Sequence, residues 1–196
     1  MHQHFKIYKP YGYLSQFISN ESKRKNKKKL GELYDFPPET MSVGRLDEDS
    51  EGLLILTTDG KMSHQILSRS FEKEYYVQVD GIISPEAIEK LQKGVEISIH
   101  GKKYQTLSCK TKLLAERPIF PERAKKVRDE RHGPTSWASI TLTEGKFRQV
   151  KKMTAAIGFP TLRLVRVRIG DIYIDGMQAG EVREITQEVD EKFYKR

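Results

Sequence analysis

The chain has 196 residues and is basic, because 35 Lys and Arg stand against 27 Asp and Glu and give a formal net charge of +8. This length allows a core that buries roughly 70% of the unfolded surface, which predicts one domain or two tightly fused lobes. The charge favours a polyanionic partner, while the single cysteine, Cys109, excludes a disulfide framework and an all-cysteine metal site and indicates a reducing compartment.

Strands outnumber helices in the predicted secondary structure. Alternating or short aliphatic runs predict strands at residues 5–9, 53–56, 75–79, 95–99, 137–142 and 162–169. Helical spacing predicts helices near residues 62–67, from Pro85 to a stop at Gly94 with Ser84 as N-cap, and over 147–157. The result is an α+β fold with a mainly antiparallel mixed sheet. The alternation changes phase between Leu164 and Val165, which predicts a β-bulge there.

Two segments concentrate positive charge. The first runs from residue 23 to 29, where like charges repel and predict a surface loop. The second runs from residue 117 to 132. The first could be an ordinary solvated loop or could bind phosphates, and the second is expected to bind phosphates. We take as candidate nucleic-acid contacts Lys23, Arg24, Lys25, Lys27, Lys28, Arg123, Lys125 and Lys126.

An acidic, glycine-bounded segment, residues 43–52, leads directly into the buried strand predicted at 53–56. Such a connection presents Asp47 rigidly, as reactive side chains need. The carboxylate could instead only shape a turn. With Glu48, Asp49 and Glu51 it could also form part of a hard-metal site, although no separate motif with ligand spacing accompanies it.

The segment Gly44-Arg45-Leu46-Asp47, followed by Ser50-Glu51-Gly52-Leu53-Leu54, resembles the catalytic segment of the ribosomal-RNA pseudouridine synthases. In that family the aspartate is the nucleophile that lets a uracil be detached from its ribose and rejoined through carbon. The resemblance implies that Asp47 is catalytic. Arg45 could contact the RNA backbone or fill the gap left when the target base flips out of its stack.

Three further segments extend the resemblance. Lys73-Glu74-Tyr75 is similar to the family's Lys-x-Tyr strand motif and implies that Tyr75 stacks on the uracil or exchanges a proton with it. Residues 144–153 are similar to the segment whose basic residue pairs with the catalytic aspartate, which implies Lys151, with Arg148 as the alternative, and leaves Lys152 for RNA. Lys9-Pro10-Tyr11-Gly12 resembles the opening of the catalytic domain, and we take Lys9 as a further RNA contact.

Residues 133–137 and 158–164 resemble the large-subunit synthase E subgroup of that family. The resemblance implies two fused lobes flanking a central catalytic cleft, within a single catalytic domain over residues 1–196 that has no separate N-terminal RNA-binding module. It further implies a cytoplasmic, monomeric enzyme that acts on large-subunit ribosomal RNA without a metal or other cofactor. The alternative is a non-catalytic RNA-binding or ribosome-assembly protein that keeps the fold. Cys109 is interpreted as a small strand residue and not as a nucleophile.

Overall fold

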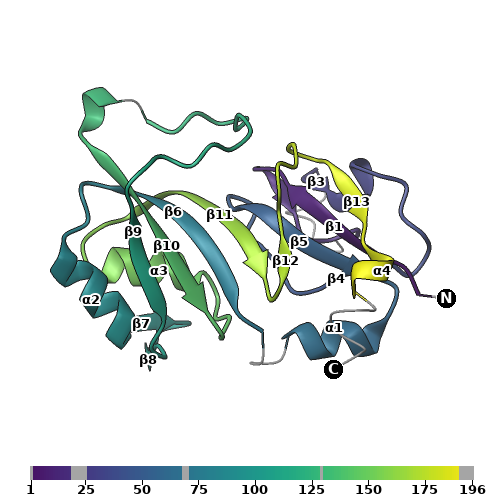
Figure 1. Ribbon diagram of the computed structural model, residues 1–196, viewed down its shortest axis with the longest axis horizontal. Coiled ribbons are helices and arrows are strands. Elements are labelled where there is room, and N and C mark those ends of the chain that lie inside the picture. The colour runs from purple at the N-terminus through teal and green to yellow at the C-terminus, as the bar shows by residue number, and fades with distance from the viewer. Residues whose placement is uncertain (1, 19–25, 68–70, 129, 190–196) are drawn as a thin grey trace. The chain divides into compact units, whose positions relative to one another are not determined.

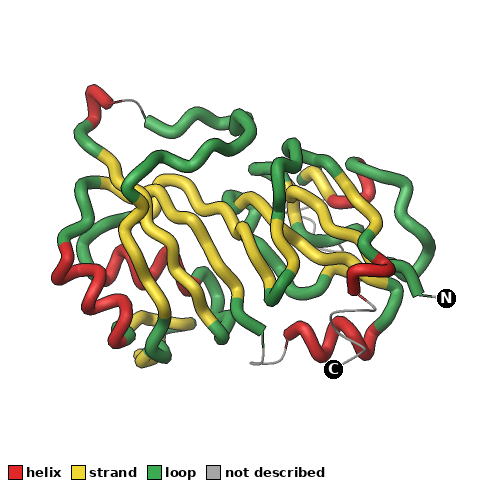
Figure 2. The backbone as a smooth tube through the Cα atoms, viewed as in Figure 1, coloured by secondary structure: helices red, strands yellow, loops and turns green. Residues whose placement is uncertain are grey.

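The computed structural model describes residues 2–18, 26–67, 71–128 and 130–189, which form two compact units (Figure 1). The first unit comprises residues 1–71, 121–125 and 166–196, and the second comprises residues 72–120 and 126–165. Each unit is therefore built from separate stretches of the chain. Figure 2 shows that strands and loops make up most of both units and that helices are few.

In the first unit the strand β1 (His4–Lys9) lies between two antiparallel neighbours, β5 (Glu51–Thr57) and β13 (Val182–Glu184). The short strand β4 (Met41–Ser42) pairs with β5, and β12 (Ile172–Tyr173) pairs with the end of β11 (Thr161–Ile169). A second small sheet pairs β2 (Tyr13–Leu14) in parallel with β3 (Lys28–Lys29). Among the described residues of this unit, the helical elements are the 3-10 turn η2 (Leu30–Glu32), α1 (Gly60–Leu67) and α4 (Thr186–Val189).

The sequence of β5 explains why this strand lies at the centre of the unit. All seven of its residues are buried, and the run Leu53–Leu56 is apolar on both faces and shows no alternation. Leu53 and Ile55 pack into one cluster with Met62 of α1. Leu54 and Leu56 point to the opposite face, where they pack with Phe5 and Ile7 of β1.

In the second unit β10 (Thr135–Leu142) lies between β6 (Lys73–Asp80) and β9 (Lys110–Leu114), and both pairings are antiparallel. A hairpin joins β7 (Glu96–Ile99) to β8 (Lys102–Gln105). The helices are α2 (Pro85–Lys93), α3 (Gln149–Ala156) and the short 3-10 turn η3 (Glu130–His132). The core lies between the sheet and the two longer helices, where Val77 and Ile140 pack with Leu91 and Met153.

The predicted α+β architecture with a mainly antiparallel sheet is confirmed, and each predicted strand and helix has a counterpart. The second helix has its predicted ends, because the Ser84 hydroxyl accepts from the Ala87 amide at 3.3 Å and Gly94 forms the C-cap. The third helix begins at Gln149, two residues later than predicted, because Arg148 has a left-handed backbone with φ of 52°. The β-bulge at Leu164–Val165 stays a prediction. None of the helices described is long and apolar enough to cross a membrane.

Gly94 provides a test of the packing between α2 and the segment after β8. Its φ is +87°, and a Cβ added there would overlap the backbone carbonyl of Thr106. We expect Gly94→Ala to lower the free energy of unfolding by about 3 kcal/mol, since backbone strain and a backbone clash add together. Gly101→Ala is the matched control, because its φ of +78° is similar but nothing lies within 4 Å of the added Cβ.

For Gly101→Ala we expect a loss of only about 1 kcal/mol. Urea denaturation followed by circular dichroism measures both variants. Equal losses for the two glycines would show that the close approach of Thr106 contributes nothing to stability.

Candidate active site

Asp47 lies in the loop that joins β4 to β5, in a half-buried position without regular secondary structure. A tight turn follows it, in which the Ser50 amide donates to the Asp47 carbonyl at 3.0 Å. The chain then enters the fully buried strand β5 at Glu51. The carboxylate is thus placed at the end of a short, hydrogen-bonded loop that is fixed on one side by the core.

Ser15 fixes the other side of this loop. Its hydroxyl donates to the Leu46 carbonyl at 2.8 Å and accepts from the Leu46 amide at 2.9 Å. Ser15 and Leu46 are both buried. One hydroxyl therefore holds both backbone groups of the residue that precedes Asp47. Sequence reasoning missed Ser15, since nothing in the local pattern connects a serine to a loop 31 residues away.

Lys9 joins the opening segment of the chain to the same loop. Its side chain is fully buried, and its ammonium donates to the carbonyls of Pro10 at 2.9 Å, Tyr13 at 2.7 Å and Glu48 at 3.5 Å. The Gly12 amide also donates to the Glu48 carbonyl, at 2.8 Å. A buried ammonium bound to backbone carbonyls has no surface to offer a phosphate. The RNA-binding role predicted for Lys9 is therefore wrong, and the residue positions the loop instead.

The first basic segment is described only in part, because Lys23, Arg24 and Lys25 lie outside the described residues. Lys27 is exposed and pairs with Glu48 at 2.8 Å, next to Asp47 in the chain. Lys28 is exposed as well and lies 5.4 Å from the centre of the Tyr13 ring. Arg45 is exposed two residues before Asp47. Lys27 and Arg45 thus place positive charge at this loop, and Lys28 lies beside Tyr13 on the surface of the same unit.

The carboxylates near Asp47 do not share one site. Glu51 is buried at the start of β5, whereas Glu48 faces the exposed ammonium of Lys27. Among the residues that the structure describes, no three His, Cys, Asp or Glu side chains are grouped so that they could hold a metal ion.

In the second unit, Tyr75 lies on β6 opposite Ile140 of β10 and packs, half-buried, against the core. Tyr76 points to the opposite face, and its ring meets the Phe120 ring edge-on with 6.1 Å between centres. The strand therefore separates the two tyrosines, and only Tyr75 lies on the face that carries the core and helix α3.

The segment before helix α3 is held by a buried carboxylate. Glu144 accepts from the Tyr104 hydroxyl at 2.5 Å, from the Leu107 amide at 2.9 Å and from the Gln149 side-chain amide at 2.6 Å. The Gln149 amide oxygen in turn accepts from the Lys146 backbone at 2.9 Å. Sequence reasoning missed Glu144 and Gln149 as individual residues, although both lie in the segment that the motif singled out.

The three basic residues of this segment are placed differently from one another. Arg148 precedes the helix in a left-handed conformation, and Lys151 is half-buried within it. Lys152 donates to the Ser98 carbonyl of β7 at 2.7 Å, and its ammonium lies 5.0 Å from the centre of the Phe147 ring. A lysine anchored in this way serves the packing of α3 on β7, in addition to any contact with RNA.

The second basic segment contacts aromatic rings. The Arg123 guanidinium lies 4.6 Å from the centre of the Tyr11 ring, while Lys125 and Lys126 are exposed. The Phe120 ring packs 5.8 Å from Trp137 and 5.5 Å from the Arg163 guanidinium. Arg128 forms an ion pair with Asp80. The aromatic contacts hold the segment at Phe120 and Arg123, the ion pair holds it at Arg128, and Lys125 and Lys126 between them stay on the surface.

Asp47 belongs to the first unit, whereas Tyr75, Arg148 and Lys151 belong to the second. The pairing of Asp47 with Lys151 or Arg148, and the central cleft that would contain Asp47 and Tyr75, stay predictions.

Cys109 has the features of a packing residue. It contacts the core of the second unit, and its sulfur lies 3.1 Å from the Leu91 carbonyl. Burial raises the pKa of the Cys109 thiol above its ordinary value, and the negative charge of Glu144 acts in the same direction. The thiol is therefore protonated at neutral pH, which agrees with the interpretation that it is not a nucleophile.

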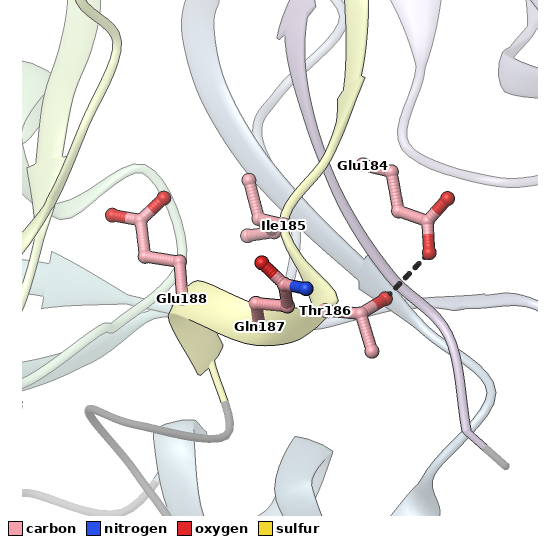
Figure 3. A pocket seen from close by; sticks show the side chains of 5 residues that line it. All are labelled: Glu184, Ile185, Thr186, Gln187 and Glu188. Atoms are coloured by element: carbon pink, nitrogen blue, oxygen red, sulfur yellow. Dashed lines mark hydrogen bonds between the residues drawn. The ribbon is translucent and has the colours of Figure 1, made fainter.

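A hollow of about 450 Å³ lies in the first unit beside α4, lined by Glu184, Ile185, Thr186, Gln187 and Glu188 (Figure 3). The dashed line in Figure 3 marks the Thr186 hydroxyl donating to Glu184 at 2.8 Å. The Thr186 oxygen also accepts from the His4 amide at 3.2 Å. This hollow contains none of the candidate residues, and its two carboxylates would repel phosphates.

The chain is similar to known proteins over most of its length. Residues 3–156 match the family model described as RNA pseudouridylate synthase. The ribosomal large subunit pseudouridine synthase E of Vibrio parahaemolyticus is 42% identical over 90% of this chain and 71% of its own. The protein of the same name from Xanthomonas axonopodis is 40% identical over 86% of each chain. A crystal structure of a pseudouridylate synthase superposes with a TM-score of 0.77 at 29% identity, covering 98% of this chain and 74% of that one.

The positioning role of Lys9 can be separated from a phosphate contact. Lys9→Met removes the donor that the partly buried carbonyls of Pro10 and Tyr13 share, so we expect the free energy of unfolding to fall by about 2 to 4 kcal/mol. The slope of log K against log salt concentration for RNA binding should stay that of the wild type, because no phosphate contact is lost. Chemical denaturation and a salt titration of RNA binding measure the two effects.

Lys126→Gln is the matched control, because Lys126 is exposed on the second basic segment. This variant should keep the stability of the wild type and reduce the salt slope by about one. A reduced salt slope for Lys9→Met at unchanged stability would restore the phosphate-binding role.

Proposed function

Since the chain belongs to the RNA pseudouridylate synthase family, we propose that it isomerises a uridine to pseudouridine in large-subunit ribosomal RNA, with Asp47 as the nucleophile. The observation that carries the substrate is the identity of about 40% to two large-subunit enzymes over most of this chain. The observation that supports the nucleophile is the half-buried position of Asp47 on a loop whose backbone is held by Ser15 and Lys9.

The reaction exchanges one bond to the ribose for another. The bond between N1 of uracil and C1′ of the ribose breaks, and a bond between C5 and C1′ forms. C5 loses its proton and N1 gains one, so the product is an isomer and no oxidant, reductant or group donor is consumed. A carboxylate suits this exchange because it can stabilise positive charge on the sugar or form a bond to an intermediate.

Asp47 could act at the sugar, at the base or through a glycal, and all three routes need an ionised carboxylate that does not move during the exchange. The hydrogen bonds of Leu46 and Glu48 restrict the backbone on both sides of Asp47. Holding a reacting group in place in this way lowers the entropy cost of the step. The loop therefore supports a nucleophile better than it supports a surface carboxylate with no chemical role.

The other roles are assigned from the second unit. We assign to Tyr75 the contact with the freed uracil, because its ring is only half-buried and a phenol can stack on the base or exchange a proton with it. We assign to Lys151 the cation that pairs with Asp47, with Arg148 as the alternative. Lys152 is less suited to that pairing, because its ammonium already donates to Ser98.

We assign the binding of folded RNA to the exposed cations. Arg45, two residues before the nucleophile, is placed to assist the extrusion of the target nucleotide. Lys27, Lys28, Lys125 and Lys126 are exposed and would contact phosphates, which makes affinity fall with salt. We place the enzyme in the cytoplasm, where ribosomal RNA is modified, and expect it to act as a monomer.

The nucleophile is tested by replacing one carboxylate at a time. We expect Asp47→Asn to lower the rate of pseudouridine formation at least about 10³-fold, because the amide can neither attack nor carry charge. RNA affinity should stay within about twofold of the wild type, since no phosphate contact is removed. Release of tritium from C5-labelled uridine measures the rate, and mass-tagged pseudouridine locates the product.

Asp49→Asn is the matched control, because it removes a carboxylate from the same turn. We expect this variant to keep a rate within about tenfold of the wild type. Equal modification by wild type and Asp47→Asn would refute the nucleophile. RNA binding without product from the wild type would support the non-catalytic RNA-binding alternative.

Single-turnover kinetics distinguish the two candidate partners of Asp47. If Lys151 pairs with the nucleophile, Lys151→Met should lower the rate by about 100-fold or more, since the carboxylate loses its compensating charge. Arg148→Met should then cost less than about tenfold, and Lys151→Arg should restore part of the rate because it keeps the charge. The reverse order of the two Met variants would assign the pairing to Arg148.

A further inference from the structure

A second group of basic and aromatic residues lies on the second unit, outside the residues given catalytic roles above. It is formed by the tip of the β7–β8 hairpin and the segment before α3, which packs against β7 (Figure 1). The His100 and Phe147 rings are stacked, with 5.5 Å between their centres and 18° between their planes. Both residues are exposed, and Phe147 retains 54% of its accessible surface.

The backbone at both ends of this stack has an unusual conformation. Ile99 pairs with Lys102, so His100 and Gly101 form a two-residue hairpin loop in which both have positive φ, 49° and 78°. Such turns prefer Asn or Gly at the first position, and His there costs stability. Arg148, which follows Phe147, is also left-handed. Strained conformations that a protein keeps at its surface point to a function of the side chains they present.

Cations lie beside the Phe147 ring and along the hairpin. The Lys152 ammonium lies 5.0 Å from the centre of the Phe147 ring, and Lys146 lies 4.9 Å from the centre of the Tyr104 ring of β8. Lys102 and Lys103 extend the hairpin strand and are exposed. Glu96 compensates the charge of Lys103, with which it pairs at 3.0 Å, and Glu144 is buried among hydrogen-bond donors. The positive charge available to RNA here is therefore that of Lys102, Lys146 and Lys152.

We propose that His100, Phe147, Lys102, Lys146 and Lys152 form a platform that binds unpaired nucleotides of the RNA substrate away from the target uridine. A base stacks on the imidazole, which continues the ring stack into solvent, and the lysines contact the flanking phosphates. The partner is single-stranded RNA and not a duplex, because a duplex keeps its base faces inside the helix. This proposal rests on RNA being the substrate of the enzyme.

The platform is fixed before RNA arrives. Lys152 donates to the Ser98 carbonyl, which ties α3 to β7, and the Glu144 network ties the segment before α3 to Tyr104 and Leu107. The rings thus lie on two segments that are held together by hydrogen bonds. Little conformational entropy is then lost when a base stacks, which suits weak, repeated contacts with a long RNA.

Binding of fluorescein-labelled octaadenylate, followed by fluorescence anisotropy, tests the platform. We expect His100→Asn to weaken binding about 5- to 100-fold, because it removes the stacking ring while Asn keeps the hairpin turn. Phe147→Leu should weaken binding in the same direction, since the imidazole loses its support. Ile82→Ala removes an exposed apolar side chain from the same unit and should leave affinity unchanged.

The melting temperature of each variant shows that it is folded. A blunt RNA duplex of similar charge should bind wild type and His100→Asn equally, because only phosphate contacts remain. Octaadenylate affinity unchanged in folded His100→Asn, or an equal loss for the duplex, would overturn the platform. A crosslink from 4-thiouridine in an unpaired oligonucleotide to the peptide that contains His100 would support it directly.

These outcomes are independent of catalysis, since octaadenylate contains no uridine and can be tested with the Asp47→Asn variant as well. Loss of pseudouridine activity in every preparation with normal octaadenylate binding would refute the proposed reaction and leave the platform intact. Normal activity together with octaadenylate binding that is insensitive to His100 and Phe147 would refute the platform alone.

Discussion

The candidate nucleophile depends on the burial of one ammonium group. Lys9 is fully buried, and its ammonium donates to carbonyl oxygens of the turn that follows it and of Glu48. Removing a charge from water is costly, so these carbonyls must remain in place around it. The chain from Pro10 to Tyr13 and the loop that carries Asp47 are therefore fixed to each other, and Ser15 adds a second tie through Leu46.

The second unit uses the opposite charge for the same purpose. Glu144 is a buried carboxylate, and hydrogen-bond donors from β8, from the segment after it and from helix α3 converge on it. It sets the start of α3 and hence the direction in which Lys151 leaves the helix. Each unit thus positions its own candidate catalytic residue with a buried charged group that satisfies its hydrogen bonds through nearby polar groups.

The sequence predicted the elements of the fold well, because local physics determines them. The run Leu53–Leu56 is apolar at every position and is buried on both faces, while Ser84, Pro85 and Gly94 bound α2 through capping alone. The start of α3 was wrong by two residues. The residue types before α3 do not predict the left-handed conformation of Arg148. That conformation accompanies the hydrogen bonds of Glu144 and Gln149 and the packing of α3 on β7.

Candidate site residues could be predicted from the sequence where they lie in a recognisable motif. Residues that support the site through hydrogen bonds to distant parts of the chain could not. Asp47, Tyr75 and Lys151 were found from their segments, but Ser15 contributes through two hydrogen bonds to a residue 31 positions away. The role of Lys9 could not be predicted from its motif either. Its residue type suggested a surface contact with phosphate, and only the arrangement of three carbonyls around it reveals a structural role. A lysine in a motif is therefore assigned to RNA only after its burial is known, and the exposed cations Arg45, Lys27 and Lys126 satisfy that condition where Lys9 does not.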